Sequence, residues 1–230
     1  MNAITMLKLP YQFGGTADAV YPVILRHEES AVLIDCGFTG YLPLLEQAAM
    51  DAGIPLETLT GVFITHQDHD HMGALAELKR KYPAVKVWTG ATEAPYVSGE
   101  VQPLRLLQAE ALQKTLPPEQ QAFGEAFLRI LRGVEPVKPE GLLRDGDRLP
   151  WGGGCRVIGT PGHTPGHLSL YVEPEDLLIA GDAAVAENGV LVIANPQFTL
   201  DPAAAEDSLE KLKHWGAGRM ICYHSGLWQF

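Results

Sequence analysis

The run THQDHDHMG, residues 65–73, holds the side chains of this sequence that are best suited to chemistry. Positions 66–71 alone carry three histidines and two aspartates, directly after the predicted strand GVFIT. Carboxylates and imidazoles crowded at a buried strand end repel or desolvate one another unless a cation lies between them. Imidazole suits zinc and iron, and carboxylate suits harder ions, so the mixture favours a transition-metal site.

One such run cannot complete two coordination shells, and three further candidate ligands follow other predicted strands. His163 lies in the turn TPGHTPGH after CRVIG, Asp182 follows DLLIAG, and His224 ends the run RMICYH. Loops at strand ends can converge on one edge of a sheet. Each of these residues is a weak signal by itself, but together and in this order they are specific.

The elements that must position these residues are mostly strands, with helices at intervals. Apolar or alternating runs bounded by turn residues predict the strands. A helix is predicted after Asp201, which suits an N-cap, and Pro202, which suits the first helical position. Two more helices are YLPLLEQAAMDAG and HMGALAELKRKYP. The predicted strands are AITMLKL, AVYPVILRH, SAVLIDCG, GVFIT, VKVW, GLLRDGDRLP, CRVIG, HLSLYVE, DLLIAGD, GVLVIA and RMICYH.

A helical insert interrupts the strand pattern at about residues 93–140. Two helices, PLRLLQAEALQKTL and PEQQAFGEAFLRILRG, are separated by Pro117 and Pro118. Their apolar residues follow helical spacing, which indicates packing onto the main body or a homodimer contact. A lid or pocket wall over the metals is the functional alternative. The residues concerned are Leu104, Leu107, Phe123, Phe127, Ile130 and Leu131.

In this order the motifs resemble those of the metallo-β-lactamase superfamily, and the resemblance covers nearly the whole chain. Asp35 in LIDCG matches the first motif and residues 66–71 the second, while His163, Asp182 and His224 match the third to fifth. The resemblance implies a single α/β domain over residues 1–230, folded as a four-layer αβ/βα sandwich with metals at one edge. It also implies the ligands of two metal ions: His66, Asp68 and His163 for one, Asp70, His71 and His224 for the other, and Asp182 between them.

One position departs from the family pattern. The second motif is usually HxHxDH, but here Asp68 stands where its second histidine belongs, and His69 falls at a variable position. We expect Asp68 to bind metal; the alternatives are a weakened first site or rescue by His69. A third carboxylate makes the cluster more electron-rich, so iron or manganese would compete with zinc. Bound water would then be acidified less strongly than the pKa of about 7 typical of catalytic zinc.

The resemblance implies hydrolysis by a hydroxide held between the metals, with Asp70 as the candidate catalytic residue that helps protonate the leaving group. No Gly-x-Ser-x-Gly elbow supports a serine hydrolase. We expect Asp35 to brace the metal loops through hydrogen bonds, and His167 and Tyr223 to be structural.

The composition limits the expected binding partners and the expected cellular location of the protein. The net charge of −11 and the absence of a Lys/Arg cluster disfavour nucleic acid. No apolar stretch approaches the ~20 residues of a membrane span. The first residues do not read as a signal peptide, and the three cysteines form no CxxC pair, so we expect a reduced, cytoplasmic protein.

The expected substrate is a small lactone, ester or thioester, and the expected cofactors are two divalent ions, with zinc preferred. The resemblance disfavours three branches of the family. β-Lactamases with a cysteine ligand place that cysteine where Asp182 stands here. Glyoxalase II enzymes add a C-terminal helical domain and RNA-processing members have basic surfaces, and we expect neither feature in this chain. An iron-dependent redox enzyme, of dioxygenase or diiron type, is the main alternative on the same fold. A non-catalytic protein that keeps the fold is a third.

Overall fold

The computed structural model describes residues 4–13 and 16–230, and two six-stranded sheets form their centre. The first sheet has antiparallel pairs on one side and parallel pairs from β5 to β8. In spatial order its strands are β1 (Ile4–Met6), β4 (Val23–His27), β5 (Ser30–Ile34), β6 (Gly61–Ile64), β7 (Lys86–Gly90) and β8 (Gly141–Leu143).

The second sheet is antiparallel except for one parallel pair, β12 with β15. Its strands are, in spatial order, β16 (Gly226–Gln229), β15 (Arg219–Cys222), β12 (Leu177–Gly181), β11 (Leu168–Val172), β10 (Cys155–Gly159) and β9 (Arg148–Leu149). Two small hairpins lie outside both sheets: β2 (Leu9–Phe13) with β3 (Thr16–Val20), and β13 (Val185–Glu187) with β14 (Val190–Val192).

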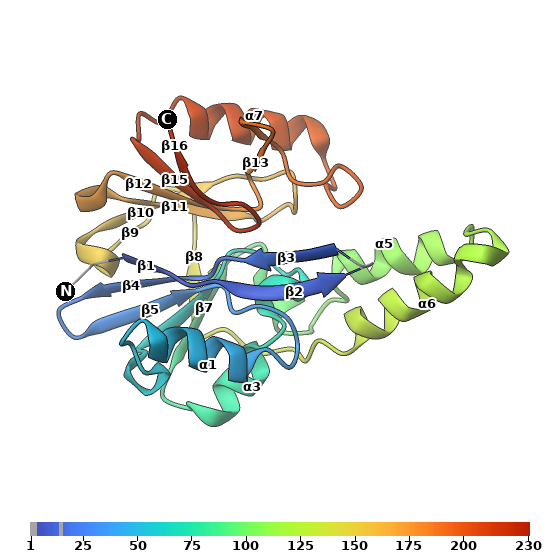
Figure 1. The fold of residues 1–230 in the computed structure, drawn as a ribbon, viewed down its shortest axis with the longest axis horizontal. Helices are drawn as coiled ribbons and strands as arrows, with labels where there is room; N and C mark the ends of the chain where they lie inside the picture. Colours follow the sequence, from blue (N-terminus) through green and yellow to red (C-terminus); the bar gives the residue numbers. More distant parts are fainter. Residues whose placement is uncertain (1–3, 14–15) are drawn as a thin grey trace.

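Helices cover the outer faces of both sheets, which confirms the predicted four-layer sandwich (Figure 1). α1 (Leu42–Asp51) and α3 (Leu75–Lys81) bury Leu45 and Leu78 against the first sheet, and α7 (Pro202–Lys213) buries Leu209 and Leu212 against the second. Shorter helices are α2 (His69–Met72), α4 (Ala94–Val97) and the 3₁₀ turns η1 (Leu56–Thr58), η2 (Trp151–Gly153) and η3 (Glu173–Glu175).

Apolar side chains fill the space between the two sheets. Phe63 of β6 is fully buried there, and its ring centroid lies 6.0 Å from that of Trp151. Ile34 of the first sheet and Leu170 and Ile179 of the second belong to the same cluster. The strand that ends at the histidine-rich run is therefore anchored in the interior.

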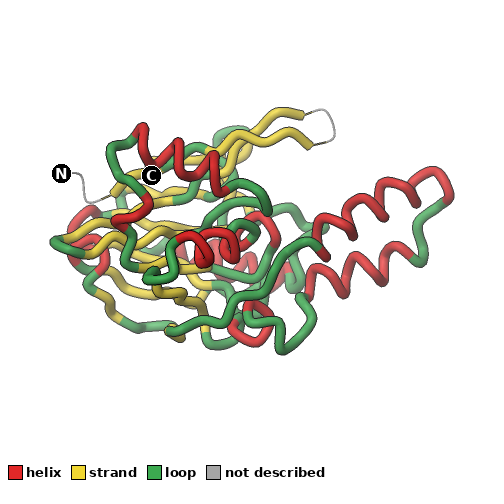
Figure 2. The backbone as a smooth tube through the Cα atoms, turned by 90° about the horizontal axis from the view of Figure 1, so that it is seen from below, coloured by secondary structure: helices red, strands yellow, loops and turns green. Residues whose placement is uncertain are grey.

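The helical insert projects from the sandwich as a hairpin of α5 (Leu104–Gln113) and α6 (Pro118–Arg132) (Figures 1 and 2). Leu131 is buried, but Leu107, Phe123 and Ile130 are 43–57% exposed. Because only the base of the hairpin reaches the sandwich, these three residues do not pack onto the body, and the other expectation, a homodimer contact, stays a prediction.

Several strand predictions need correction, among them AVYPVILRH, which divides at Tyr21 and Pro22 into the end of β3 and β4. GLLRDGDRLP divides into β8 and β9, which belong to different sheets, because a turn forms at Gly146 (φ +88°), where the Asp147 carboxylate accepts from the amide of Arg144 at 2.8 Å. The run AITMLKL ends early at Met6, and β16 follows His224 unpredicted. In the described part of the chain, no helix has the length and apolar character needed to cross a bilayer.

Replacing Phe63 with alanine should lower the free energy of unfolding by about 3–5 kcal/mol, because a cavity opens between the sheets. The matched change Phe123→Ala removes a ring that is 57% exposed and should cost no more than about 0.5 kcal/mol. Urea unfolding of both variants measures the difference; equal losses would contradict this description of the core.

Candidate metal centre

The predicted ligands meet at one edge of the sandwich because their strands end there. β5 and β6 run parallel, as do β12 and β15, so the carboxyl ends of each pair lie side by side. His66 comes two residues after β6, Asp182 directly after β12, and His224 two residues after β15. His163 lies in the turn between β10 and β11.

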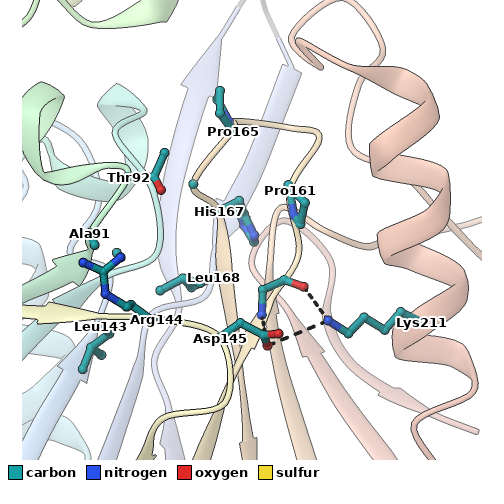
Figure 3. Close-up of a pocket in the computed structure, with 13 residues that line it drawn as sticks. Ala91, Thr92, Leu143, Arg144, Asp145, Pro161, Pro165, His167, Leu168 and Lys211 are labelled. Carbon is teal, nitrogen blue, oxygen red and sulfur yellow. Dashed lines mark hydrogen bonds and ion pairs between the residues drawn. The ribbon is translucent and has the colours of Figure 1, made fainter.

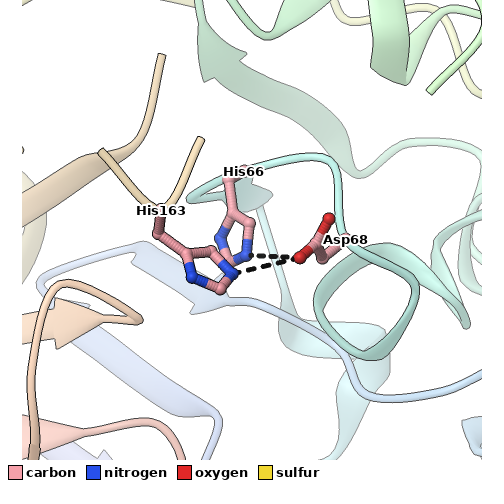
Figure 4. A group of neighbouring side chains, drawn as sticks. All are labelled: His66, Asp68 and His163. Atoms are coloured by element: carbon pink, nitrogen blue, oxygen red, sulfur yellow. Dashed lines mark hydrogen bonds and ion pairs between the residues drawn. The ribbon is translucent and has the colours of Figure 1, made fainter. Parts of the chain in front are cut away.

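The first group of ligands comprises His66, Asp68 and His163 (Figure 4). Oδ2 of Asp68 lies 3.1 Å from Nε2 of His163 and 3.7 Å from Nε2 of His66. Two donors that bind one tetrahedral zinc ion at ~2.1 Å are about 3.4 Å apart. The spacing therefore fits a single metal ion, with Asp68 in the position that a histidine usually fills.

The second group comprises Asp70, His71 and His224. Oδ2 of Asp70 lies 3.2 Å from Nε2 of His224 and 3.9 Å from Nε2 of His71. His69 belongs to neither group; its ring packs edge-on against Phe38, with centroids 5.7 Å apart. The geometry therefore gives no support to the alternative in which His69 rescues a weakened first site.

Asp182 lies between the two groups. Its Oδ1 is 3.2 Å from Nε2 of His71 and 3.3 Å from Nε2 of His224, while its Oδ2 is 3.4 Å from Nε2 of His163. One carboxylate therefore faces ligands of both groups, which is the arrangement that a bridge between two cations requires.

Several of these buried atoms lack hydrogen bonds that would satisfy them. Among the described residues, Nε2 of His66, Nε2 of His71, Oδ1 of Asp68 and Oδ1 of Asp182 are buried and make no well-formed hydrogen bond. Buried polar atoms are normally paired, and a set of such atoms aimed at one another is the signature of a metal position. The residues present thus fit divalent cations in both groups.

The predicted brace, Asp35, orients two of the imidazoles. It is buried and accepts from Nδ1 of His71 at 2.9 Å and from Oγ1 of Thr65 at 2.9 Å. Oγ1 of Thr65 in turn lies 3.0 Å from Nδ1 of His66. Because Nδ1 is engaged in both rings, Nε2 of each is left to face the metal position.

His167 and Tyr223 support the ligands from behind. Nε2 of His167 accepts from the backbone amide of Asp182 at 3.0 Å, and Nδ1 lies 2.8 Å from Oγ1 of Thr160. The hydroxyl of Tyr223 donates to the backbone carbonyl of Asp70 at 2.6 Å and is buried. Both residues fix the backbone next to a ligand, as expected of structural residues.

Glu93 was missed by the sequence analysis. It is fully buried, and its carboxylate accepts from the amide of Gln67 at 3.0 Å and from the amide of Gly166 at 2.8 Å. Burial raises the pKa of Glu93 against the lowering effect of these hydrogen bonds. The carboxylate ties the 66–71 run to the turn that carries His163, a long-range contact without a local sequence signal.

Arg105 was also missed. It lies in the first turn of α5, is 3% exposed, and its Nη2 lies 2.7 Å from Oδ2 of Asp68. Burial alone would raise the pKa of Asp68, but Arg105 and His163 hold that pKa well below its usual range. An arginine between leucines at the start of an insert helix gave no indication that it would reach a metal ligand.

Aromatic side chains contact His69, the neighbour of Asp70 in the histidine-rich run. The ring of Phe127, from α6, lies 5.6 Å from that of His69 and 6.0 Å from that of Phe198, measured between centroids. Phe38 contacts His69 from the other side. The base of the insert therefore contributes side chains to the surroundings of the metal centre.

A separate pocket of about 530 Å³ lies behind the turn that carries His163 (Figure 3). Arg144, Asp145 and Lys211 border it, and Nζ of Lys211 donates to the carbonyl of Gly159 at 2.9 Å. None of the predicted metal ligands lines this pocket. We therefore centre the site on the metal ligands and not on this cavity.

The carboxylates and histidines of the site shift one another's pKa values. Burial alone would lower the pKa of His71 and of His224, but the surrounding carboxylates, Asp182 first, raise both well above the usual value. Burial would raise the pKa of Asp182, and these two histidines instead hold it well below its ordinary range.

A family model described as the metallo-beta-lactamase superfamily matches residues 15–218, and the chain belongs to this superfamily. A probable metallo-hydrolase of Bacillus subtilis is 30% identical over 207 residues, which cover 84% of this chain and 75% of that protein. Together these matches identify the chain as a metallo-hydrolase.

Two further relatives show how far the likeness extends. A hydroxyacylglutathione hydrolase of Bartonella henselae is 28% identical over 83% of this chain, a match that spans only 56% of that protein. The crystal structure of a metallo-beta-lactamase family protein from Thermus thermophilus superposes with a TM-score of 0.78 over 99% of this chain and 75% of its own, at 22% identity. The latter likeness shows the fold alone.

Zinc binding to metal-free protein at pH 7 should release at least about two protons, because His71 and His224 must be neutral to bind metal. As the pH rises through the raised pKa values of these histidines, fewer protons are displaced and zinc should bind more tightly. Calorimetry in two buffers of different ionisation enthalpy counts the protons. Release of one proton or none would contradict the assignment of both histidines as ligands.

Proposed function

We propose that the chain hydrolyses a small lactone, ester or thioester at a dinuclear metal centre. The observation that carries this proposal is the position of Asp182, whose two oxygens face His163 of the first group and both His71 and His224 of the second. Two divalent cations in these groups would supply a water deprotonated near neutral pH and would polarise a carbonyl oxygen.

In this proposal the side chains of the site bind the two cations and transfer a proton to the leaving group. The first group (His66, Asp68 and His163) would bind one cation, and the second group (Asp70, His71 and His224) would bind the other. Asp182 would bind both cations. We assign proton transfer to the leaving group to Asp70. Burial alone would raise the pKa of Asp70, but His71, His69 and His224 lower it, so its carboxylate is ionised.

The surroundings support an uncharged substrate with an apolar part. Phe38, Phe127 and Phe198 border the site, and an acidic protein with a net charge of −11 does not attract polyanions. Relatives named as hydroxyacylglutathione hydrolases support the cleavage of an acyl compound. We therefore place the apolar part of the substrate against the base of the insert, which makes the insert a pocket wall.

Zinc is our proposed metal, with iron and manganese as competitors, because histidines supply four of the seven ligands. We further propose a reducing, cytoplasmic location, which the three unpaired cysteines support. A homodimer through the exposed residues of the hairpin stays a prediction.

Asp182→Ala should lower kcat/KM for the best substrate in a panel of lactones, esters and thioesters by at least about 100-fold, because both cations lose a shared ligand. The matched control Asp207→Ala, an exposed position on α7, should leave the rate unchanged. Assays use protein of measured metal content, under nitrogen, with zinc or manganese. Full activity of Asp182→Ala, or turnover that needs iron and oxygen, would overturn the proposal.

A further inference from the structure

Arg105 contacts the one ligand that departs from the family motif. Its Nε and Nη2 donate to Oδ2 of Asp68 at 3.2 and 2.7 Å. The same oxygen faces Nε2 of His163 at 3.1 Å, and Nη2 of Arg105 lies 3.5 Å from that nitrogen. The guanidinium therefore lies next to the first metal group, while Oδ1 of Asp68 stays buried without a hydrogen bond.

The guanidinium is held in place by the surroundings of α5. Gln67, the neighbour of Asp68, accepts from the amide of Leu104 at 2.7 Å through its Oε1, so the metal-binding run also caps the start of the helix. Nη1 of Arg105 donates to Oε1 of Gln108 at 2.5 Å, and Nη2 donates to the backbone carbonyl of Phe198. With all these donors engaged, Arg105 is fixed at Asp68 by the base of the insert.

We propose that Arg105 balances the charge of Asp68 at the first metal group, and that Asp68 and Arg105 together replace the neutral histidine of the usual motif. This inference rests on the proposed function, because it concerns a cation held by His66, Asp68 and His163. The insert is then coupled to the metal centre, since the helix that projects from the body delivers the compensating charge.

A count of the charges in the metal cluster supports this assignment. Two divalent cations bring four positive charges, and three carboxylates with a hydroxide bring four negative charges, which leaves a neutral cluster. The usual cluster, with a histidine in place of Asp68, keeps one positive charge, and Arg105 restores it here. The expectation from the sequence that iron or manganese would compete with zinc counted the third carboxylate without Arg105, and it stays a prediction.

A purely structural role for Arg105 predicts a different response to mutation. If Arg105 only oriented Asp68, its removal would loosen a ligand and weaken metal binding. If Arg105 balances charge, its removal leaves a buried, uncompensated carboxylate that attracts a divalent cation more strongly. The sign of the change in zinc affinity separates the two roles.

The test compares Arg105→Met, Asp68→His and the double variant by zinc titration against a chromophoric chelator. We expect Arg105→Met to tighten the first zinc at least about tenfold and Asp68→His to weaken it at least about tenfold, because each leaves one buried charge unpaired. The double variant, with a neutral pair, should return to within about threefold of the wild type. His163→Ala, which lacks a ligand of the first group only, shows which dissociation constant belongs to that group.

Two controls keep the result interpretable. Arg105→Lys retains the charge and should bind zinc like the wild type, and Arg132→Met removes an exposed arginine of α6 and should change nothing. Thermal unfolding of chelator-treated protein reports whether each variant folds. If Asp68→His does not fold, the comparison of zinc affinity between Arg105→Met and Arg105→Lys still tests the inference. Weaker or unchanged zinc binding in Arg105→Met overturns the inference, whereas a wild type that binds no zinc overturns the proposed function itself.

Discussion

Buried negative charge at one edge of the sandwich is the constraint on which the rest of this structure depends. Asp35, Asp68, Asp70 and Asp182 are all at most 8% exposed and lie within a few residues of strand ends. An ionised carboxylate in such surroundings is stable only when it is paired with a cation or a strong hydrogen-bond donor. Metal ions, protons on histidines and one arginine are the means by which this chain meets that requirement.

Each of these buried carboxylates is paired in a different way. Asp35 is paired with Thr65 and with a histidine ring nitrogen and needs no metal. Asp70 and Asp182 face His71 and His224 and raise the pKa values of these histidines, so cations and protons compete for the same side chains. Asp68 has a permanent partner in Arg105. The charge partners of the two groups therefore differ: the carboxylates of the second face histidines, whereas Asp68 of the first faces an arginine of the insert.

The fold and the ligand set were predictable because their signals are local. Strand periodicity and the run after β6 can be read within a few residues, and the resemblance supplied the sandwich and the order of the ligands. Arg105 and Glu93 could not be found in this way, because the Asp68–Arg105 and Gln67–Glu93 contacts join residues 37 and 26 positions apart. The exposed face of α5 and α6 escaped prediction for a related reason: helical spacing shows an apolar stripe but not whether anything covers it.

Diffraction from zinc-loaded crystals at the zinc absorption edge tests the central claim most directly. The account predicts two anomalous peaks per chain, about 3.5–4 Å apart, with Asp182 between them and Asp68 in contact with one. A single peak, or two peaks that Asp182 does not join, would contradict it.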